Sequence, residues 1–236
     1  SQTNDAIAWF HFSDSAPQTR AILRDQLGIN PLVLEALLAH ETRPRFTPFD
    51  EGELVILRAI NLNPGDVPED MISLRLWVEP RRVVSVCRQP VLAIADLRQQ
   101  LEKKHHLQTS GDLVTGLIAR ITDRIRQVVT EMDDTLDQLE DDILENTTPD
   151  GRNRLLVLHR ETIWLKRFLV PQLDALQALL EAPPSWCQEH HQVRIRESEN
   201  MTQRMLESLN AIRDHVVMLQ ERLTSVLVEK THRTIY

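Results

Sequence analysis

The spacing of apolar residues divides the chain into two parts that meet at Pro90. Before that residue, short apolar runs alternate with turn residues, and after it the apolar residues recur every three or four positions. The first part predicts helices over 17–27 and 32–39 and strands over 54–62, 71–78 and 83–87. The second part predicts helices over 91–104, 110–146 and 152–181, and a terminal helix that Ser185 caps. We therefore expect a mixed α/β head followed by long helices.

The terminal helix carries a heptad pattern, in which apolar residues alternate at steps of four and three. Its members are Met205, Leu209, Ile212, Val216, Leu219, Leu223 and Val226. This pattern is typical of helices that wind around a partner, and at about 1.5 Å per residue the helix would extend about 75 Å. We expect it to project or to assemble with copies of itself. The pattern leaves open whether the seam faces another subunit or the same chain.

Neither end of the sequence looks like the natural end of a domain. The chain begins with Ser1 and not with Met, and no Gly, Asn or Pro ends the helix before Tyr236. We expect this chain to be a piece of a longer protein.

Composition excludes several classes of function. The formal net charge of −8 disfavours a nucleic-acid partner and favours cations. Two cysteines, Cys87 and Cys187, do not make a disulfide framework, which indicates a reducing cytoplasm. No segment approaches the roughly 20 apolar residues of a membrane span. Phosphate-binding, serine-hydrolase and zinc-protease motifs are also absent from the sequence, so we expect neither an enzyme nor an organic cofactor.

Two groups of residues are candidates for binding a metal ion. Asp137 and Asp141 lie one helical turn apart in an acidic stretch, where their carboxylates share a face that suits hard divalent cations. A solvated helix face is the alternative interpretation. Cys187 and His190, three residues apart and followed by His191, can reach one Zn²⁺ ion from the start of the terminal helix. Alternatively, Cys187 is a small buried residue beside Trp186, and the histidines lie on the surface.

Several strings of residues resemble the CorA-type divalent-cation transporters. They are LGINP at 27–31, LEALL at 34–38 and ETRPR at 41–45. LRAINLNP at 57–64, PEDMISLRLW at 68–77 and LKRFLVPQ at 165–172 are most similar to the ZntB branch, whose members handle zinc. The resemblance spans nearly the whole chain.

This resemblance implies an α+β fold, with an N-terminal α/β/α sandwich built on a mixed sheet and a projecting stalk helix. It divides the chain into a head at 1–104, a helical layer on the head at 105–183 and a stalk at 184–236 that leads to a missing membrane domain. It implies the cytoplasmic funnel of a homopentamer at the inner membrane of a bacterium. Zn²⁺ is the expected transported or regulatory ion and Mg²⁺ a second candidate, while uptake and efflux both stay open.

Two other functions compete with the transporter. A soluble coiled-coil interaction protein with an α/β head would show the same heptads, but its chain would stop after Tyr236. A metal-dependent hydrolase would bind Zn²⁺ tightly and turn over an ester. Neither alternative explains the strings that resemble the CorA-type transporters.

Overall fold

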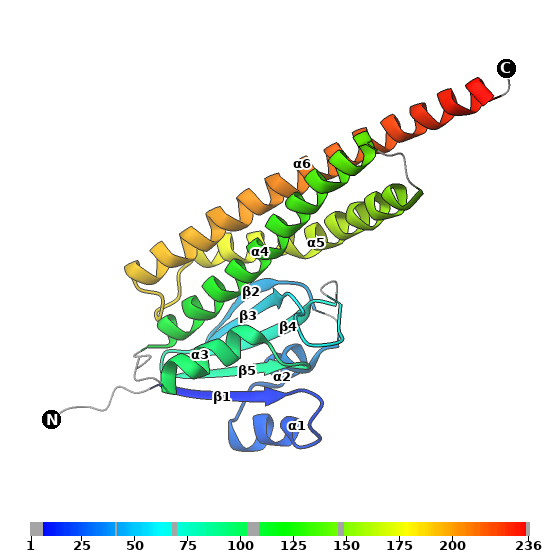
Figure 1. Cartoon of the computed structure of the whole chain (residues 1–236). Helices are drawn as coiled ribbons and strands as arrows, with labels where there is room; N and C mark the ends of the chain where they lie inside the picture. Colours follow the sequence, from blue (N-terminus) through cyan, green and yellow to red (C-terminus); the bar gives the residue numbers. More distant parts are fainter. Residues whose placement is uncertain (1–6, 41, 68–69, 103–108, 146–148, 235–236) are drawn as a thin grey trace. The chain divides into compact units, whose positions relative to one another are not determined.

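The computed structural model describes residues 7–40, 42–67, 70–102, 109–145 and 149–234 (Figure 1). The chain forms two compact units: unit 1 comprises Ser1–Ile125 and Phe168–Thr202, and unit 2 comprises Arg126–Arg167 and Gln203–Tyr236. Each of the three long helices contributes to both units. Within the described ranges, no helix is both long enough and apolar enough to cross a bilayer.

Unit 1 is built on a five-stranded mixed sheet. Its strands are β1 (Ala8–Ser13), β2 (Arg45–Phe49), β3 (Gly52–Ala59), β4 (Ile72–Glu79) and β5 (Arg82–Cys87), in the order β1-β5-β4-β3-β2. β1 runs parallel to β5, and the other neighbours are antiparallel. The mixed sheet and its three central strands are confirmed. The sequence pattern missed β1 and β2, the two edge strands, whose apolar alternation is weak and, in β2, interrupted by Pro48.

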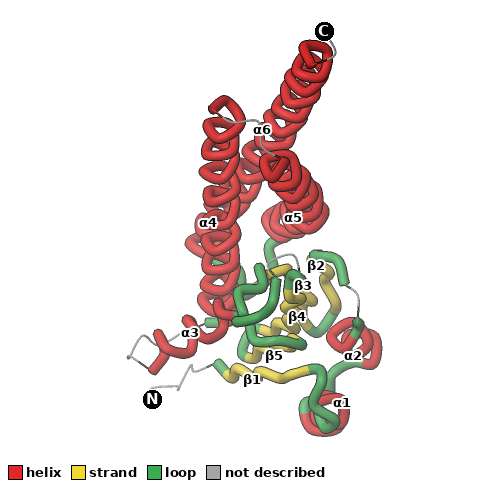
Figure 2. Tube along the Cα trace, turned by 45° about the vertical axis from the view of Figure 1, so that its right-hand side comes forward, coloured by secondary structure: helices red, strands yellow, loops and turns green. Residues whose placement is uncertain are grey.

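The helices confirm the second part of the pattern to within a few residues (Figure 2). They are α1 (Thr19–Ala21), followed by a π-helical turn at Ile22–Gln26, then α2 (Pro31–Leu38), α3 (Leu92–Glu102), α4 (Ser110–Glu145), α5 (Pro149–Glu181) and α6 (Glu189–Thr234). Asn30 caps α2, because its Oδ1 atom accepts the Leu32 N–H at 2.9 Å. Pro171 lies inside α5, which continues through it.

The sheet is covered on both faces, so unit 1 is an α/β/α sandwich. One face packs against the π-helical turn and α2, in a cluster that includes Leu23, Val33 and Leu37. α3 and the first turns of α4 lie on the other side, as Figure 2 shows. Seven of the eight β4 residues are buried, which is what covering both faces requires.

Two long-range hydrogen bonds tie later parts of the chain to β3. Gln172, which is 3% exposed, accepts the Arg58 N–H at 2.7 Å through its Oε1 atom. This bond lies beyond Ile56, the last β3 residue that pairs with β2. Trp186 Nε1 donates to Glu53 Oε2 at 2.6 Å. The second half of α5 and the connection before α6 are thereby anchored to the sheet within unit 1.

Unit 2 is a three-helix core that buries the heptad seam. The six seam residues from Met205 to Leu223 are at most 3% exposed, and the Val226 side chain lies outside the described residues. α6 contacts α4 through His215 Nε2 and Glu140 Oε2 at 3.1 Å, and α5 through Asn210 Oδ1 and Lys166 Nζ at 2.5 Å. The seam therefore packs against the same chain. The sequence pattern left open whether the seam faces another subunit or the same chain, and the structure shows the second arrangement.

His11 on β1 provides a test of the sandwich through pH. Burial lowers the pKa of His11 to about 4, helped by the nearby charge of Arg98 and opposed by a hydrogen bond with Ser85. Its Nε2 atom lies 3.7 Å from the thiol of Cys87. The unfolded chain takes up this proton near pH 6.5, so between pH 6.5 and 4 the unfolded state binds more protons than the folded state.

We therefore expect the free energy of unfolding to decrease as the pH is lowered from 6.5 to 4. His11 should contribute at most about 1.4 kcal/mol per pH unit to this decrease. Urea unfolding at about pH 7, 6 and 5 measures this slope, and His11→Asn should make it shallower. His40→Asn, at an exposed histidine, should keep the slope of the original protein. Identical slopes for all three proteins would show that His11 is not held neutral by the fold.

Candidate functional site

The first turns of α4 and α6 meet in unit 1, where α4 begins with a full capping box and α6 with half of one. At α4 the Thr109 hydroxyl accepts the Asp112 N–H at 3.1 Å, while Asp112 Oδ2 accepts the Thr109 N–H at 3.0 Å and its hydroxyl at 2.9 Å. These reciprocal bonds satisfy backbone donors that an isolated helix end leaves without partners. Thr109 is thus the N-cap. Ser110 lies inside the helix and donates to the Glu79 carbonyl at 2.7 Å.

At α6 a histidine takes the place that Glu or Gln usually holds in a capping box. His191 Nδ1 accepts the Gln188 N–H at 3.1 Å, and the His191 N–H donates to the Gln188 carbonyl at 3.0 Å. Gln188 is therefore the residue that precedes the helix. The predicted cap at Ser185 is wrong, because residues 182–188 form a turn-rich connection and α6 begins at Glu189.

Asp112 and His191 join the two boxes. Because Nδ1 of His191 accepts a backbone proton, the neutral ring carries its own proton on Nε2, which lies 3.1 Å from Asp112 Oδ1 and donates to it. Burial lowers the pKa of His191, with the bond to Asp112 opposing that effect. Burial of Asp112 raises its pKa, but the hydrogen bonds from His191 and Thr109 outweigh this, and the pKa is lowered overall. The resting pair is a neutral imidazole and a carboxylate.

The ring of His191 fits against the α4 backbone because residue 111 is glycine. A Cβ atom on Gly111 would lie 2.3 Å from His191 Cε1 and 2.6 Å from the Trp186 carbonyl oxygen. The His191 side chain has no exposed surface, whereas that of the adjacent His190 is 59% exposed. The predicted surface position of the histidines is therefore wrong for His191 and right for His190.

The structure brings two of the predicted metal ligands together and adds one that the sequence analysis missed. One ligand atom each from Asp112, His190 and His191 lie within 4.8 Å of one another. Cys187 belongs to no such group among the described residues, and it precedes α6 instead of lying on its first turns. Burial raises the pKa of its thiol to about 11, which disfavours the thiolate that a metal would need. Cys187 is buried beside buried Trp186, as the alternative interpretation expected.

Asp137 and Asp141 lie on α4 in unit 2, and both side chains are exposed. Neither joins a group of three potential ligands within the described part of the chain. A hard divalent cation needs more oxygen ligands than one helix face supplies. Cation binding there stays a prediction, and it requires ligands from a second copy of the chain.

The double variant Asp137→Ala/Asp141→Ala tests this surface. If it binds Mg²⁺ or Zn²⁺, a cation concentration of ten times Kd stabilises the original protein by about 1.4 kcal/mol, and the double variant loses that gain. Thermal unfolding with and without the cation measures the difference. Glu131→Ala removes an exposed carboxylate from another side of α4 and should retain the gain. If the cation stabilises all three proteins equally, Asp137 and Asp141 do not bind it and lie on a solvated helix face.

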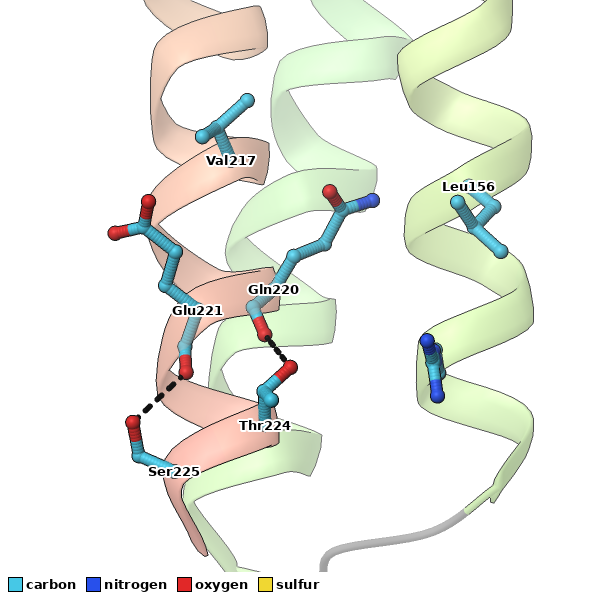
Figure 3. A pocket seen from close by; sticks show the side chains of 7 residues that line it. Leu156, Val217, Gln220, Glu221, Thr224 and Ser225 are labelled. Atoms are coloured by element: carbon cyan, nitrogen blue, oxygen red, sulfur yellow. Dashed lines mark hydrogen bonds between the residues drawn. The ribbon is translucent and has the colours of Figure 1, made fainter. Parts of the chain in front are cut away.

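Unit 2 also contains an open groove of about 460 Å³ between α5 and α6. It is lined by Arg152, Leu156, Val217, Gln220, Glu221, Thr224 and Ser225. Figure 3 shows Gln220 pointing from α6 toward α5, and its Nε2 atom is buried without a hydrogen-bond partner in the described structure. Thr224 and Ser225 donate to the Gln220 and Glu221 carbonyls of their own helix. The groove thus offers apolar surface and one unused donor.

Comparison with known proteins identifies relatives over nearly the whole chain. The protein is 36% identical over 231 residues to the divalent cation transporter CmaX of Pseudomonas aeruginosa, covering 97% of this chain and 69% of CmaX. The solved structure of full-length CmaX matches with a TM-score of 0.92 at 35% identity, over 97% of this chain and 70% of that one. The zinc transport protein ZntB of Pectobacterium atrosepticum is 27% identical, with coverage of 97% and 69%.

A further structural match concerns an isolated domain. The crystal structure of the ZntB cytoplasmic domain from Vibrio parahaemolyticus matches with a TM-score of 0.85 at 25% identity, over 97% of this chain and 92% of that domain. The family model of the CorA-like Mg²⁺ transporter protein matches residues 4–236. Together with the sandwich and the long helices, these matches confirm the resemblance and the fold class that the sequence strings implied. The chain therefore belongs to the CorA-like Mg²⁺ transporter family.

Proposed function

We propose that this chain is the cytoplasmic domain of a divalent-cation transporter in the inner membrane of a bacterium. In this role it forms the intracellular mouth of the pore and regulates the passage of ions. The single observation that carries the proposal is the match to the ZntB cytoplasmic domain, which covers nearly all of both chains. The net charge of −8 supports it, because a negative potential concentrates cations at the mouth of a pore.

Zn²⁺ is the proposed ion, and Mg²⁺ is the second candidate. The relatives named ZntB are zinc transport proteins, whereas the CmaX relative is named only as a divalent cation transporter and the family model refers to Mg²⁺. Imidazole groups at the start of α6 favour a borderline ion such as Zn²⁺ over a hard one. The matched relatives are transporters by name, and the proposal includes no enzymatic step.

The transporter is proposed to be a homopentamer, with unit 2 contacting neighbouring copies. Large apolar side chains remain exposed on its α5 and α6: Leu156 at 51%, Ile163 at 53% and Met218 at 58%. Since the heptad seam is already buried within the chain, we propose that these exposed apolar side chains contact a second copy.

Reconstitution of the full-length protein encoded by the parent gene tests the proposal. We expect the reading frame beyond Tyr236 to encode two apolar segments of about 20 residues, with a Gly-x-Asn motif after the first. Liposomes that contain this protein should pass Zn²⁺ or Mg²⁺, as measured with an ion-sensitive dye inside the vesicles. Empty liposomes are the control. A stop codon after Tyr236, or absence of flux for both ions, would overturn the proposal and favour a soluble coiled-coil interaction protein.

Light scattering tests the assembly separately. The isolated chain should associate as its concentration rises, and Met218→Glu on the exposed face of α6 should weaken that association. Val193→Glu places the same charge at an exposed apolar position in unit 1 and serves as the matched control. A monomer at every concentration, with and without Zn²⁺, would contradict assembly through this surface.

A further inference from the structure

We propose that Asp112, His190 and His191 bind a Zn²⁺ ion that links the first turn of α4 to the first turn of α6. This inference goes beyond the transport function, because the ion would be held by the sandwich of unit 1 as a ligand. It rests on three side chains whose ligand atoms lie within 4.8 Å of one another, although 78 residues or more separate Asp112 from the histidines in sequence.

Two of the three distances between these atoms are close to those around a tetrahedral ion. Ligand atoms about 2.0–2.2 Å from Zn²⁺ lie about 3.3–3.6 Å from one another in a tetrahedron. Asp112 Oδ1 is 3.1 Å from His191 Nε2 and 3.9 Å from His190 Nε2. Rotation of the exposed His190 side chain suffices to adjust the longer separation. Two imidazoles and one carboxylate leave the fourth position to water, which is the arrangement of an exchangeable zinc site and not of a closed structural one.

The surroundings select zinc over hard cations. Two helix N-termini meet at this point, and their partial positive charges disfavour a cation that is held by charge alone. A single carboxylate offsets only part of this effect. Mg²⁺ needs octahedral oxygen ligands and would find one carboxylate, whereas Zn²⁺ forms strong bonds to neutral imidazole nitrogens. We therefore expect the site to bind Zn²⁺ and to ignore Mg²⁺.

Zinc binding must break two hydrogen bonds of the His191 ring, the one to Asp112 and the one from Gln188. In the resting junction the proton of His191 is on Nε2, the atom that faces Asp112, and Nδ1 accepts the Gln188 N–H. To ligate through Nε2, the ring has to carry its proton on Nδ1, where it can no longer accept from Gln188. The number of protons on the ring is unchanged. Zinc thus competes with the capping box of α6, so an ion in the sandwich changes how this helix begins.

The second carboxylate oxygen of Asp112 keeps its partners throughout. Its Oδ2 atom accepts from the Thr109 N–H and hydroxyl, while Oδ1 faces the histidines. Hydrogen bonds of this kind orient a metal-binding carboxylate and support its affinity for the ion. The hydrogen bonds at the start of α4 therefore hold Asp112 in place, while the bond between Gln188 and His191 at the start of α6 must break for His191 to bind the ion.

Calorimetric titration of the purified chain with ZnCl₂ and with MgCl₂ tests the site. We expect one Zn²⁺ per chain and no heat that saturates with Mg²⁺. His190→Gln should weaken Zn²⁺ binding at least about tenfold. Loss of a residue that only hydrogen-bonds to a metal ligand already weakens binding by about that factor, and His190 would be a ligand itself. His190 is exposed, so this variant should fold normally. His40→Gln, at an exposed histidine elsewhere in unit 1, is the matched control and should bind as the original protein does.

His191→Gln separates the metal site from the capping box. Glutamine at this position of a capping box can accept the Gln188 N–H, and its amide can still donate to Asp112. The variant should therefore stay folded but lose Zn²⁺ affinity by the same factor as His190→Gln. Cys187→Ser should change nothing, because Cys187 is not part of the site. Nitrogen-detected NMR of the His191 ring should show its proton on Nε2 without zinc and on Nδ1 with zinc.

Unchanged Zn²⁺ affinity in both His190→Gln and His191→Gln would overturn the proposal and leave the junction as a pair of capping boxes. Equal binding of Mg²⁺ and Zn²⁺ would also overturn it. Loss of this site is distinguishable from failure of the proposed transport function, because the flux assay on the full-length protein measures ions that cross the membrane. Transport can persist in a His190→Gln protein that no longer binds zinc in unit 1.

Discussion

Replacement of Arg75 by Met is expected to lower the free energy of unfolding by about 3–5 kcal/mol, the usual cost of removing one partner of a buried ion pair. Arg75 lies in β4 and is 2% exposed, and its guanidinium donates to Asp14 Oδ2 at 2.9 Å. The Asp14 side chain is only 9% exposed. Without Arg75, the remaining cation near this carboxylate among the described residues is Arg88, at 3.9 Å. The Leu37 carbonyl at the end of α2 also loses the donor that it has at 2.7 Å.

Urea unfolding, followed by circular dichroism, measures this loss. The double variant Arg75→Met/Asp14→Leu should recover a large part of it, because two apolar side chains leave no buried charge without a partner. Arg20→Met removes a cation from an exposed pair with Glu35, whose side chains are 51% and 68% exposed, and should cost less than about 1 kcal/mol. If Arg75→Met and Arg20→Met prove equally mild, the buried pair does not stabilise unit 1.

Arg75 also shows how far the sequence could predict the fold. Alternation over 71–78 correctly predicted β4, because periodicity depends only on neighbouring residues. It did not reveal that the second face of this strand is buried, since that depends on α2 covering the sheet. The partner of Arg75 lies 61 positions away in the chain. The edge strands were missed for a related reason: their side chains are only partly buried, so apolar alternation is weak.

The candidate site was predicted in part, and the errors have local causes. Placing the start of the terminal helix at Ser185 put Cys187 on the same face as His190, although α6 begins only at Glu189. Beginning α4 at residue 110 left out Thr109, which forms a capping box with Asp112. The spacing of Thr and Asp by three residues was the available signal. The contact between Asp112 and His191 depends on tertiary packing and has no sequence signal.

The heptad seam shows a different limit. Its period correctly identified the buried side of α6, because seam positions recur on one face of any helix. The same apolar stripe serves equally well for packing against another subunit or against α4 and α5 of the same chain. The structure shows the second arrangement: Leu209 and Val216, for example, have no exposed surface within a single chain. The seam is therefore no evidence for assembly with other copies of the chain.

Gly111→Ala is expected to destabilise the chain by about 2 kcal/mol, within the usual range for overpacking, and to abolish zinc binding at the junction. The new Cβ atom would lie 2.3 Å from Cε1 and 2.4 Å from Nδ1 of the His191 ring. It would also lie 2.6 Å from the Trp186 carbonyl oxygen, which cannot swing aside as a flexible side chain does. The indole of Trp186 is tied to Glu53, so that segment resists movement. The His191 ring must therefore leave its place beside Asp112.

Gly116→Ala is the matched control, on the same helix. The nearest atoms to its new Cβ are 3.3 Å away at the flexible end of Arg120 and 3.6 Å away on Leu97. This substitution should be neutral or stabilise by up to about 1 kcal/mol, because Ala favours the helix more than Gly does. Thermal unfolding and Zn²⁺ titration compare the two variants. If the close approach at residue 111 holds the junction together, Gly111→Ala should lose stability and zinc binding, whereas Gly116→Ala should lose neither. If Gly111→Ala gains stability as Gly116→Ala does, the two helix starts are not held in contact through His191.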